Sequence, residues 1–222
     1  LHTARCKTVD IEIPADSELV LEGRITKETH AEGPFVDLTE TYDIVREQPV
    51  LEVKKITHKK DPIYHALLPG GLEHKMLMGM PREPTIFHEV SKVVECKDVY
   101  VNPGGCSWLH GIVQIKKKKE DDGMKAIEAA FKGHTSMKHV VIVDDDINIY
   151  DPLSVEWAIA TRFQAKTRMI IRQEAGSSLD PSADPDTRET SKVGIDATKP
   201  LVSKGKNFDK ALFKEVDLKK YL

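Results

Sequence analysis

The chain has 222 residues, and 33 lysine and arginine residues nearly balance 36 aspartate and glutamate residues, which leaves a net charge of −3. This balance argues against a nucleic-acid-binding or membrane-surface protein, because both need a surface of one sign. No apolar stretch approaches the roughly 18 residues of a membrane helix, and no secretory signal opens the chain. The three cysteines are widely spaced and match no zinc motif. We therefore expect a soluble, cytoplasmic protein with reduced thiols.

The first 80 residues favour β-structure. Residues 9–13 alternate apolar and polar side chains, as a half-buried strand does, and residues 19–25 and 50–56 predict two further strands. Gly23, inside the second strand, suggests a β-bulge or a close approach of another backbone. This region is expected to form an antiparallel sheet or a barrel.

From about residue 81 the pattern alternates between helices and strands. Helices are predicted over residues 83–93, 124–131 and 152–162, and strands over residues 99–101, 109–116, 139–143 and 168–172. A long loop over residues 176–191 and an amphipathic helix over residues 208–222 complete the chain. The sequence thus predicts two domains, β-rich residues 1–80 and α/β or α+β residues 81–222, the second with a sheet covered by helices.

The first candidate for chemistry is the pair Glu32 and Asp37, on a segment that Gly33 and Pro34 bend. Two carboxylates that face one partly desolvated cavity repel each other, so one of them keeps its proton nearer to neutral pH and can act as a proton donor. Acids in a polar loop are also common as solvated turn residues, and the spacing alone does not decide between the two interpretations.

The other candidates are weaker. The acids Asp144 to Asp146 follow an apolar strand, where they could bind a divalent metal or simply leave the sheet and cap the next segment. Lys138, just before the same strand, could meet a phosphate as a point charge. The histidines at 58, 65 and 74 share one loop-rich stretch but form no metal-binding pair.

Several segments, taken together, resemble the UbiD family of decarboxylases. They occur in order along nearly the whole chain, at residues 21–23, 32–37, 56–64, 143–147, 158–162, 177–181 and 193–200. The resemblance implies the end of a split β-barrel flavin-binding domain, followed by an α/β C-terminal domain that mediates assembly. It also implies prenylated FMN and a divalent metal such as Mn²⁺ or Mg²⁺ as cofactors, with K⁺ as a further candidate.

The resemblance also implies roles for three residues. Glu32 resembles the acid that pairs with a catalytic arginine, Asp37 resembles the acid that protonates the carbon after CO2 leaves, and Lys138 resembles the lysine that reaches the cofactor phosphate. The arginine and the metal ligands have no match here and are expected upstream of Leu1, on a preceding segment or a partner chain. The isolated chain is therefore expected to be inactive.

Within the family, residues 37–43 and 65–74 resemble the archaeal branch. This implies decarboxylation of anhydromevalonate phosphate to isopentenyl phosphate in isoprenoid biosynthesis. The alternatives are an aromatic carboxy-lyase of the 4-hydroxybenzoate type and a non-catalytic oligomerisation module. Expected partners are a small unsaturated acid, a second copy of the chain and a flavin prenyltransferase that supplies the cofactor.

Overall fold

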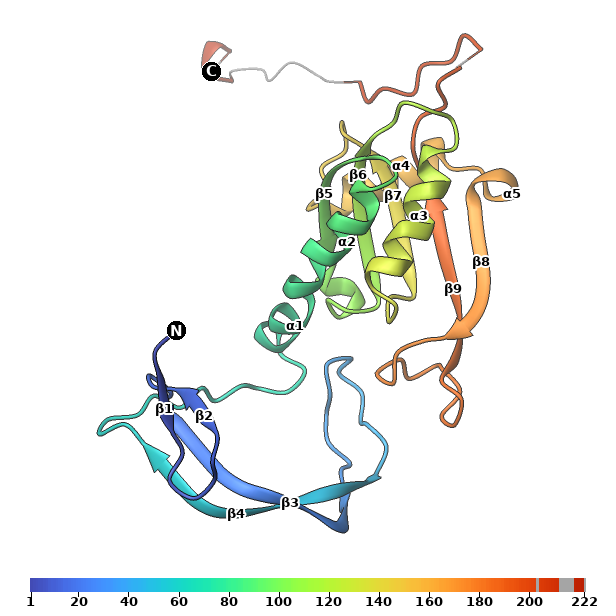
Figure 1. Cartoon of the computed structure of the whole chain (residues 1–222). Helices are drawn as coiled ribbons and strands as arrows, with labels where there is room; N and C mark the ends of the chain where they lie inside the picture. The colour runs from blue at the N-terminus through green and yellow to red at the C-terminus, as the bar shows by residue number, and fades with distance from the viewer. Residues whose placement is uncertain (203, 212–217, 222) are drawn as a thin grey trace. The chain divides into compact units, whose positions relative to one another are not determined.

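The computed structural model describes residues 1–202, 204–211 and 218–221, and it divides into two compact units, Leu1–Lys75 and Met76–Leu222 (Figure 1). The composition predicts a change near residue 80, whereas the first unit ends inside helix α1, Leu72–Gly79. The sequence pattern missed α1 because the helix is short and directly follows the loop residues Pro69, Gly70 and Gly71.

The first unit consists of two antiparallel hairpins. Strands β1 (Thr3–Arg5) and β2 (Glu12–Pro14) form the short hairpin, and β3 (Leu19–Glu32) and β4 (Arg46–His58) form the long one. The register of the long hairpin shifts between Glu22 and Gly23, as the glycine predicted. A Cβ at Gly23 would lie 2.5 Å from the Glu52 carbonyl oxygen, so the two strands approach too closely there for a side chain.

The predicted strand over residues 9–13 is largely wrong. The chain bends over residues 7–10, and the strand comprises Glu12–Pro14. The bend is held by the buried carboxylate of Glu22, which accepts hydrogen bonds from the backbone N–H groups of Lys7 at 2.9 Å and Thr8 at 2.5 Å. This contact across 14 residues outweighs the local alternation of side chains.

The second unit contains a five-stranded mixed sheet in the order β5-β6-β7-β9-β8. Its central strands β6 (His110–Lys116), β7 (His139–Asp144) and β9 (Glu189–Asp196) are parallel, and the edge strands β5 (Glu95–Val101) and β8 (Met169–Ala175) run antiparallel to their neighbours. Four of these strands match predictions, but β9 was missed. The predicted loop over residues 176–191 therefore ends where β9 begins, at Glu189.

Alternating side chains of the central strands bury both faces of the sheet. Val113 and Ile142 pack with α2 (Glu83–Ser91) and α3 (Asp122–Gly133), whereas Ile112 and Val141 pack with α4 (Pro152–Arg162), and Figure 1 shows α2 and α3 on the same face. The four-residue helix α5 (Ala165–Arg168) links α4 to β8. Asp151 caps α4 as predicted, since its side chain accepts a hydrogen bond from the Leu153 N–H.

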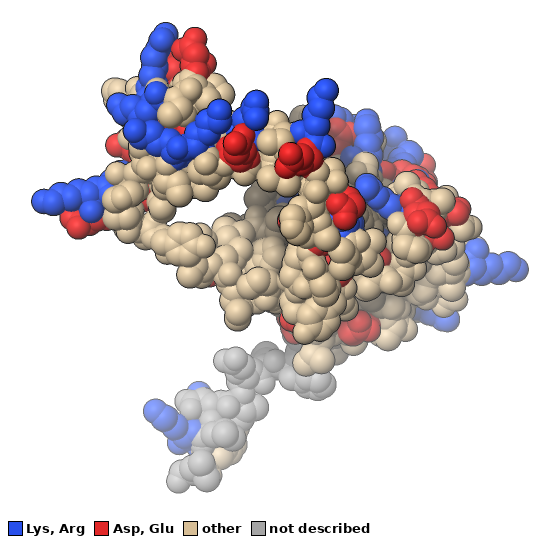
Figure 2. Space-filling view, turned by 90° about the horizontal axis from the view of Figure 1, so that it is seen from below, with Lys and Arg blue, Asp and Glu red and all other residues tan. Residues whose placement is uncertain are grey.

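The predicted tail helix over residues 208–222 falls partly outside the described residues, at 212–217 and 222. Residues 208–211 are not helical, and Leu218–Lys220 form one 3-10 turn. No helix in the described part of the chain is long and apolar enough to span a bilayer. On the face shown in Figure 2, acidic side chains lie among basic ones, in keeping with the balanced composition.

Candidate active-site residues

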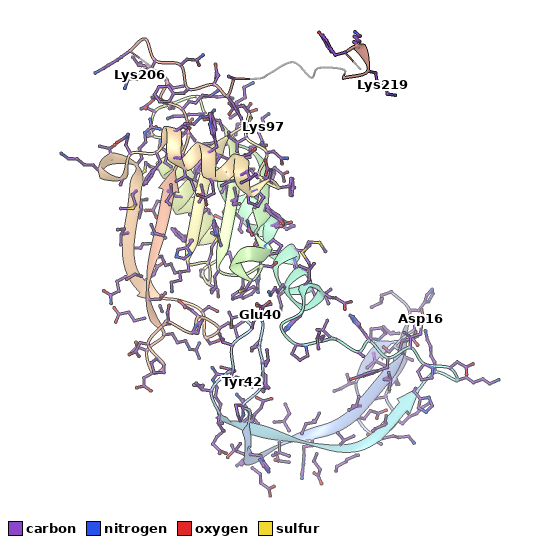
Figure 3. All side chains as sticks on the ribbon, turned by 180° about the vertical axis from the view of Figure 1, so that it is seen from behind. Asp16, Glu40, Tyr42, Lys97, Lys206 and Lys219 are labelled. Carbon is purple, nitrogen blue, oxygen red and sulfur yellow. The ribbon has the colours of Figure 1, made fainter. Side chains whose placement is uncertain are left out.

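The two predicted catalytic acids lie where β3 ends and the loop to β4 begins: Asp37 is in this loop, the acid loop (residues 33–45), and Glu32 directly precedes it. Glu32 is the last residue of β3, and Gly33 has a φ of +97°, in the left-handed region that favours glycine, so the chain turns sharply out of the strand. Val36 and Tyr42, the latter labelled in Figure 3, form an isolated antiparallel bridge. The acid loop therefore has a defined path.

Backbone contacts fix Asp37 within this loop. Its N–H donates to the Thr41 carbonyl at 3.0 Å, and its Oδ1 accepts from the Leu38 N–H at 2.6 Å. Asp37 is half-buried, whereas Glu32 is exposed. The two acids thus lie close in sequence but differ in their access to solvent.

Arg46 is a cation that both acids influence electrostatically, and sequence reasoning did not identify it. It is the cross-strand partner of Glu32 in the β3–β4 register, and its guanidinium forms an ion pair with Asp43. The hydrogen bond to Asp43 raises the pKa of Arg46 against the opposing effect of burial, and the charges of Asp37 and Glu32 raise it further. Both predicted acids therefore lie within the electrostatic reach of one arginine.

Lys138 lies in the second unit, directly before β7, and it contacts an acid rather than open solvent. Its Nζ lies 2.9 Å from Oδ2 of Asp180 and 3.1 Å from Oδ1, and it also donates to the Ser182 hydroxyl. Asp180 in turn accepts a hydrogen bond of 2.8 Å from the Thr190 hydroxyl on β9. The structure thus places Glu32 and Asp37 in one unit and Lys138 in the other.

The three acids after β7 do not form a metal site. Arg162, a buried residue, donates to Asp144 at 3.0 Å and to both oxygens of Asp146 at 2.9 and 2.7 Å, and Lys199 Nζ lies 3.2 Å from Asp146. Two cations therefore already neutralise the carboxylates that a metal would need.

The loop-region histidines also have protein partners. His65 Nε2 lies 2.8 Å from Glu73 Oε1, and His74 Nδ1 accepts from the Gly70 N–H at 3.1 Å. Within residues 1–202, 204–211 and 218–221, no group of three histidine, cysteine or acidic side chains could hold a metal ion.

Because of the buried His134, we expect the free energy of unfolding to decrease as the pH is lowered. Burial lowers the pKa of His134 to about 4, although the hydrogen bond that its Nε2–H donates to the Trp108 carbonyl at 2.9 Å opposes the shift. In the unfolded state this histidine has a pKa of about 6.5, so between pH 6.5 and 4 the unfolded state binds a proton that the folded state does not bind. This contribution to stability is complete above pH 6.5 and is lost as the pH falls through about 4.

We expect the free energy of unfolding, measured by urea titration at several pH values, to fall less steeply between pH 6.5 and 4 in His134→Gln than in the unmodified chain. Glutamine keeps a donor for the Trp108 carbonyl but does not titrate. The pKa of His110 is also lowered to about 4 by burial, and this residue stays unchanged in both proteins. Identical slopes would show that His134 is not the titrating group.

Comparisons with known proteins agree with this architecture. Residues 75–197 match the 3-octaprenyl-4-hydroxybenzoate carboxy-lyase C-terminal domain, and residues 1–72 match the Rift-related domain of the same carboxy-lyases. The two matches together cover most of the sequence. The chain belongs to the UbiD family of carboxy-lyases.

Among curated relatives, the anhydromevalonate phosphate decarboxylases of Methanocaldococcus jannaschii and Methanosarcina mazei are each 53% identical, over 88% and 92% of this chain. The alignments cover 47% and 48% of those proteins, so the chain spans about half the length of the curated relatives it matches. Among solved structures, the UbiD-class enzyme HmfF from Pelotomaculum thermopropionicum in complex with FMN matches 99% of this chain and 50% of its own, with a TM-score of 0.89 and 39% identity. The family prediction is therefore confirmed, and the mixed α/β fold matches UbiD-class enzymes over about half of their length.

Proposed function

We propose that this chain supplies the acid loop and the C-terminal domain of a prenylated-FMN decarboxylase that converts anhydromevalonate phosphate to isopentenyl phosphate and CO2. The observation that carries the proposal is the acid loop itself, where Glu32 and Asp37 lie within reach of Arg46 on a loop with a defined path. The identity to the archaeal decarboxylases, 53% for two of them, favours their substrate.

In the proposed mechanism Asp37 is the proton donor. The cofactor supplies an electron sink, which lets CO2 leave without a free carbanion. After CO2 has left, the Asp37 carboxyl group donates its proton to the carbon that carried the carboxylate, and the electron pair of the broken carbon–carbon bond ends in the new carbon–hydrogen bond. Asp37 is left as a carboxylate and must take up a proton from water before the next turnover. Glu32 and Arg46, which are cross-strand partners of opposite charge, help to keep the charged groups around Asp37 in position.

Lys138 is the residue that fits the cofactor phosphate. A lysine ammonium has three N–H donors, and Asp180 and Ser182 are the acceptors that the described residues offer it. The Lys138 side chain is 18% exposed, so an anionic ligand can approach it from solvent. This arrangement supports a contact with a phosphate group.

The rest of the proposed enzyme would come from the segment that corresponds to the other half of the relatives. In the β3–β4 hairpin, the cross-strand pairs Leu21–Ile56 and Ile25–Leu51 share one face, and these four side chains are 48–72% exposed. A two-stranded hairpin with an uncovered apolar face is marginally stable by itself. Further strands of a split barrel, carrying the catalytic arginine and the metal ligands, would cover this face.

A second candidate is an aromatic carboxy-lyase. The 3,4-dihydroxybenzoic acid decarboxylase of Klebsiella pneumoniae matches 99% of this chain with a TM-score of 0.85, at 25% identity. The lower identity makes this the less supported substrate class. A purely oligomerising role is disfavoured by the presence of both Glu32 and Asp37.

The test is turnover by the complete enzyme, meaning this chain joined to its upstream segment and loaded with prenylated FMN. The proposal expects anhydromevalonate phosphate to yield isopentenyl phosphate and CO2 in equal amounts, and 4-hydroxybenzoate to yield no phenol. Phenol release without isopentenyl phosphate would select the aromatic alternative. Absence of turnover with either acid, in enzyme shown spectroscopically to hold the cofactor, would overturn the proposed reaction.

A further inference from the structure

Asp180 is a buried acid on the loop between β8 and β9, which extends from the end of the sheet in Figure 1. Its side chain is 3% exposed. Besides Lys138 and Thr190, it accepts hydrogen bonds from the Ser182 N–H at 3.0 Å and the Ser182 hydroxyl at 2.8 Å. Four donor groups therefore converge on one carboxylate.

The surroundings of Asp180 favour its charged form. Burial acts to raise the pKa of Asp180, but the hydrogen bonds from Lys138, Ser182 and Thr190 outweigh burial and lower the pKa to about 2. The charged Asp180 carboxylate therefore gives the Lys138 ammonium a fixed partner.

The backbone on both sides of this ion pair is also held. The backbone N–H of Lys138 donates a hydrogen bond to the Leu109 carbonyl at 2.8 Å. The backbone carbonyl of Lys138 accepts a hydrogen bond from the Val193 N–H of β9 at 2.9 Å. On the loop, the buried Trp108 indole donates to the Ser177 hydroxyl at 2.9 Å, three residues before Asp180. The backbone that carries Lys138 and the loop that carries Asp180 are therefore both held by hydrogen bonds to other parts of the unit.

The location of the pair at the sheet also points to a ligand. Lys138 precedes β7, at the amino end of the parallel strands, whereas the carboxyl end of β7 is filled by the ion pairs of Asp144 and Asp146 with Arg162. Open α/β sheets commonly bind ligands at the carboxyl ends of their strands. In this unit the carboxyl end of β7 is occupied by ion pairs, and the partly exposed Lys138 side chain lies at the amino end of the same strand.

We propose that Asp180 is a positioning residue that holds the Lys138 ammonium for a phosphate monoester, the phosphate of the flavin nucleotide. The inference rests on the proposed contact between Lys138 and the cofactor. Asp180 and Ser182 hold the Lys138 ammonium from the protein side, and the phosphate would contact the part of the lysine side chain that stays exposed, 18% of its surface. Thr190 fixes Asp180 from β9. Without Asp180 the Lys138 side chain loses its fixed orientation. Ligand binding then carries the entropic cost of ordering this side chain, which weakens the affinity.

The experiment compares FMN with riboflavin, which lacks the phosphate, in the complete enzyme. Dissociation constants come from quenching of flavin fluorescence in the unmodified protein and in Lys138→Met, Asp180→Asn and the double variant. Asp180→Asn is expected to weaken FMN binding about tenfold and to leave riboflavin binding unchanged. A merely structural role would weaken both ligands together. Asp186→Asn removes an exposed carboxylate from the same loop and serves as the matched control.

The double variant tests whether Asp180 acts through Lys138. It should bind FMN no more weakly than Lys138→Met alone, because coupled residues lose their effects non-additively. If Asp180→Asn does not fold, Thr190→Val removes one hydrogen bond from Asp180 and should give a smaller loss that is again confined to FMN.

The remaining outcomes separate this inference from the proposed function. Unchanged FMN binding in Asp180→Asn, with weakened binding in Lys138→Met, would overturn the positioning role and leave the cofactor contact intact. The substrate of the proposed reaction also carries a phosphate. A raised KM for this substrate in both variants, with unchanged FMN binding, would support the positioning role and assign the phosphate to the substrate. No effect of Lys138→Met on either ligand would overturn the contact and the inference together.

Discussion

Asp37→Asn in the complete enzyme is expected to reduce the rate of decarboxylation by about 10²–10⁴-fold, the usual contribution of a positioned acid. Asparagine has the shape of aspartate and can still accept the Leu38 N–H through its amide oxygen, so the loop contact at 2.6 Å can be retained. Its amide does not release a proton near neutral pH. The loss should therefore appear in product formation under single-turnover conditions with saturating substrate.

Two measurements exclude trivial causes for this loss. Flavin absorbance should show an unchanged cofactor content, and size-exclusion chromatography should show an unchanged oligomer. Asp16→Asn is the matched control, because Asp16 is an exposed acid of the same unit, labelled in Figure 3, and lies in the turn before β3. Full activity in Asp37→Asn would remove Asp37 from the mechanism and leave Glu32 as the remaining candidate donor.

The position of the two acids on an irregular segment could be predicted from sequence because its signal is local. Glu32 and Asp37 are five positions apart on a segment that Gly33 and Pro34 exclude from regular structure, and the structure shows them at the end of β3 and in the following loop. The same holds for the Asp151 cap and for the buried run of β7, since each depends on adjacent residues.

The residues that sequence reasoning missed depend on pairing between distant segments. Arg46 meets Glu32 through the register of a hairpin, and Asp180 meets Lys138 across the 42 positions that separate them. The strand β9 was missed because buried Thr190 and Lys192 break the apolar pattern that marks a central strand. These polar side chains are satisfied by tertiary partners, Asp180 and Glu174, which no local pattern reveals.

The acids at the carboxyl end of β7 have a structural consequence that can be measured. The Arg162 side chain is fully buried and Asp144 is 7% exposed, so their ion pair is shielded from water. Burial raises the pKa of Asp144, although Arg162 and the Lys199 N–H favour its charged form. Removing one partner of such a pair leaves an uncompensated buried charge, which usually costs about 3–5 kcal/mol.

Arg162→Met is therefore expected to lower the free energy of unfolding by about 3–5 kcal/mol in chemical denaturation near neutral pH. Lys166→Met, a loss of an exposed cation on the adjacent α5, is the matched control and should change stability by less than about 0.5 kcal/mol. The double variant Arg162→Met with Asp144→Asn should be more stable than Arg162→Met alone, because it removes the stranded charge. Equal losses in Arg162→Met and Lys166→Met would show that this ion pair does not stabilise the domain.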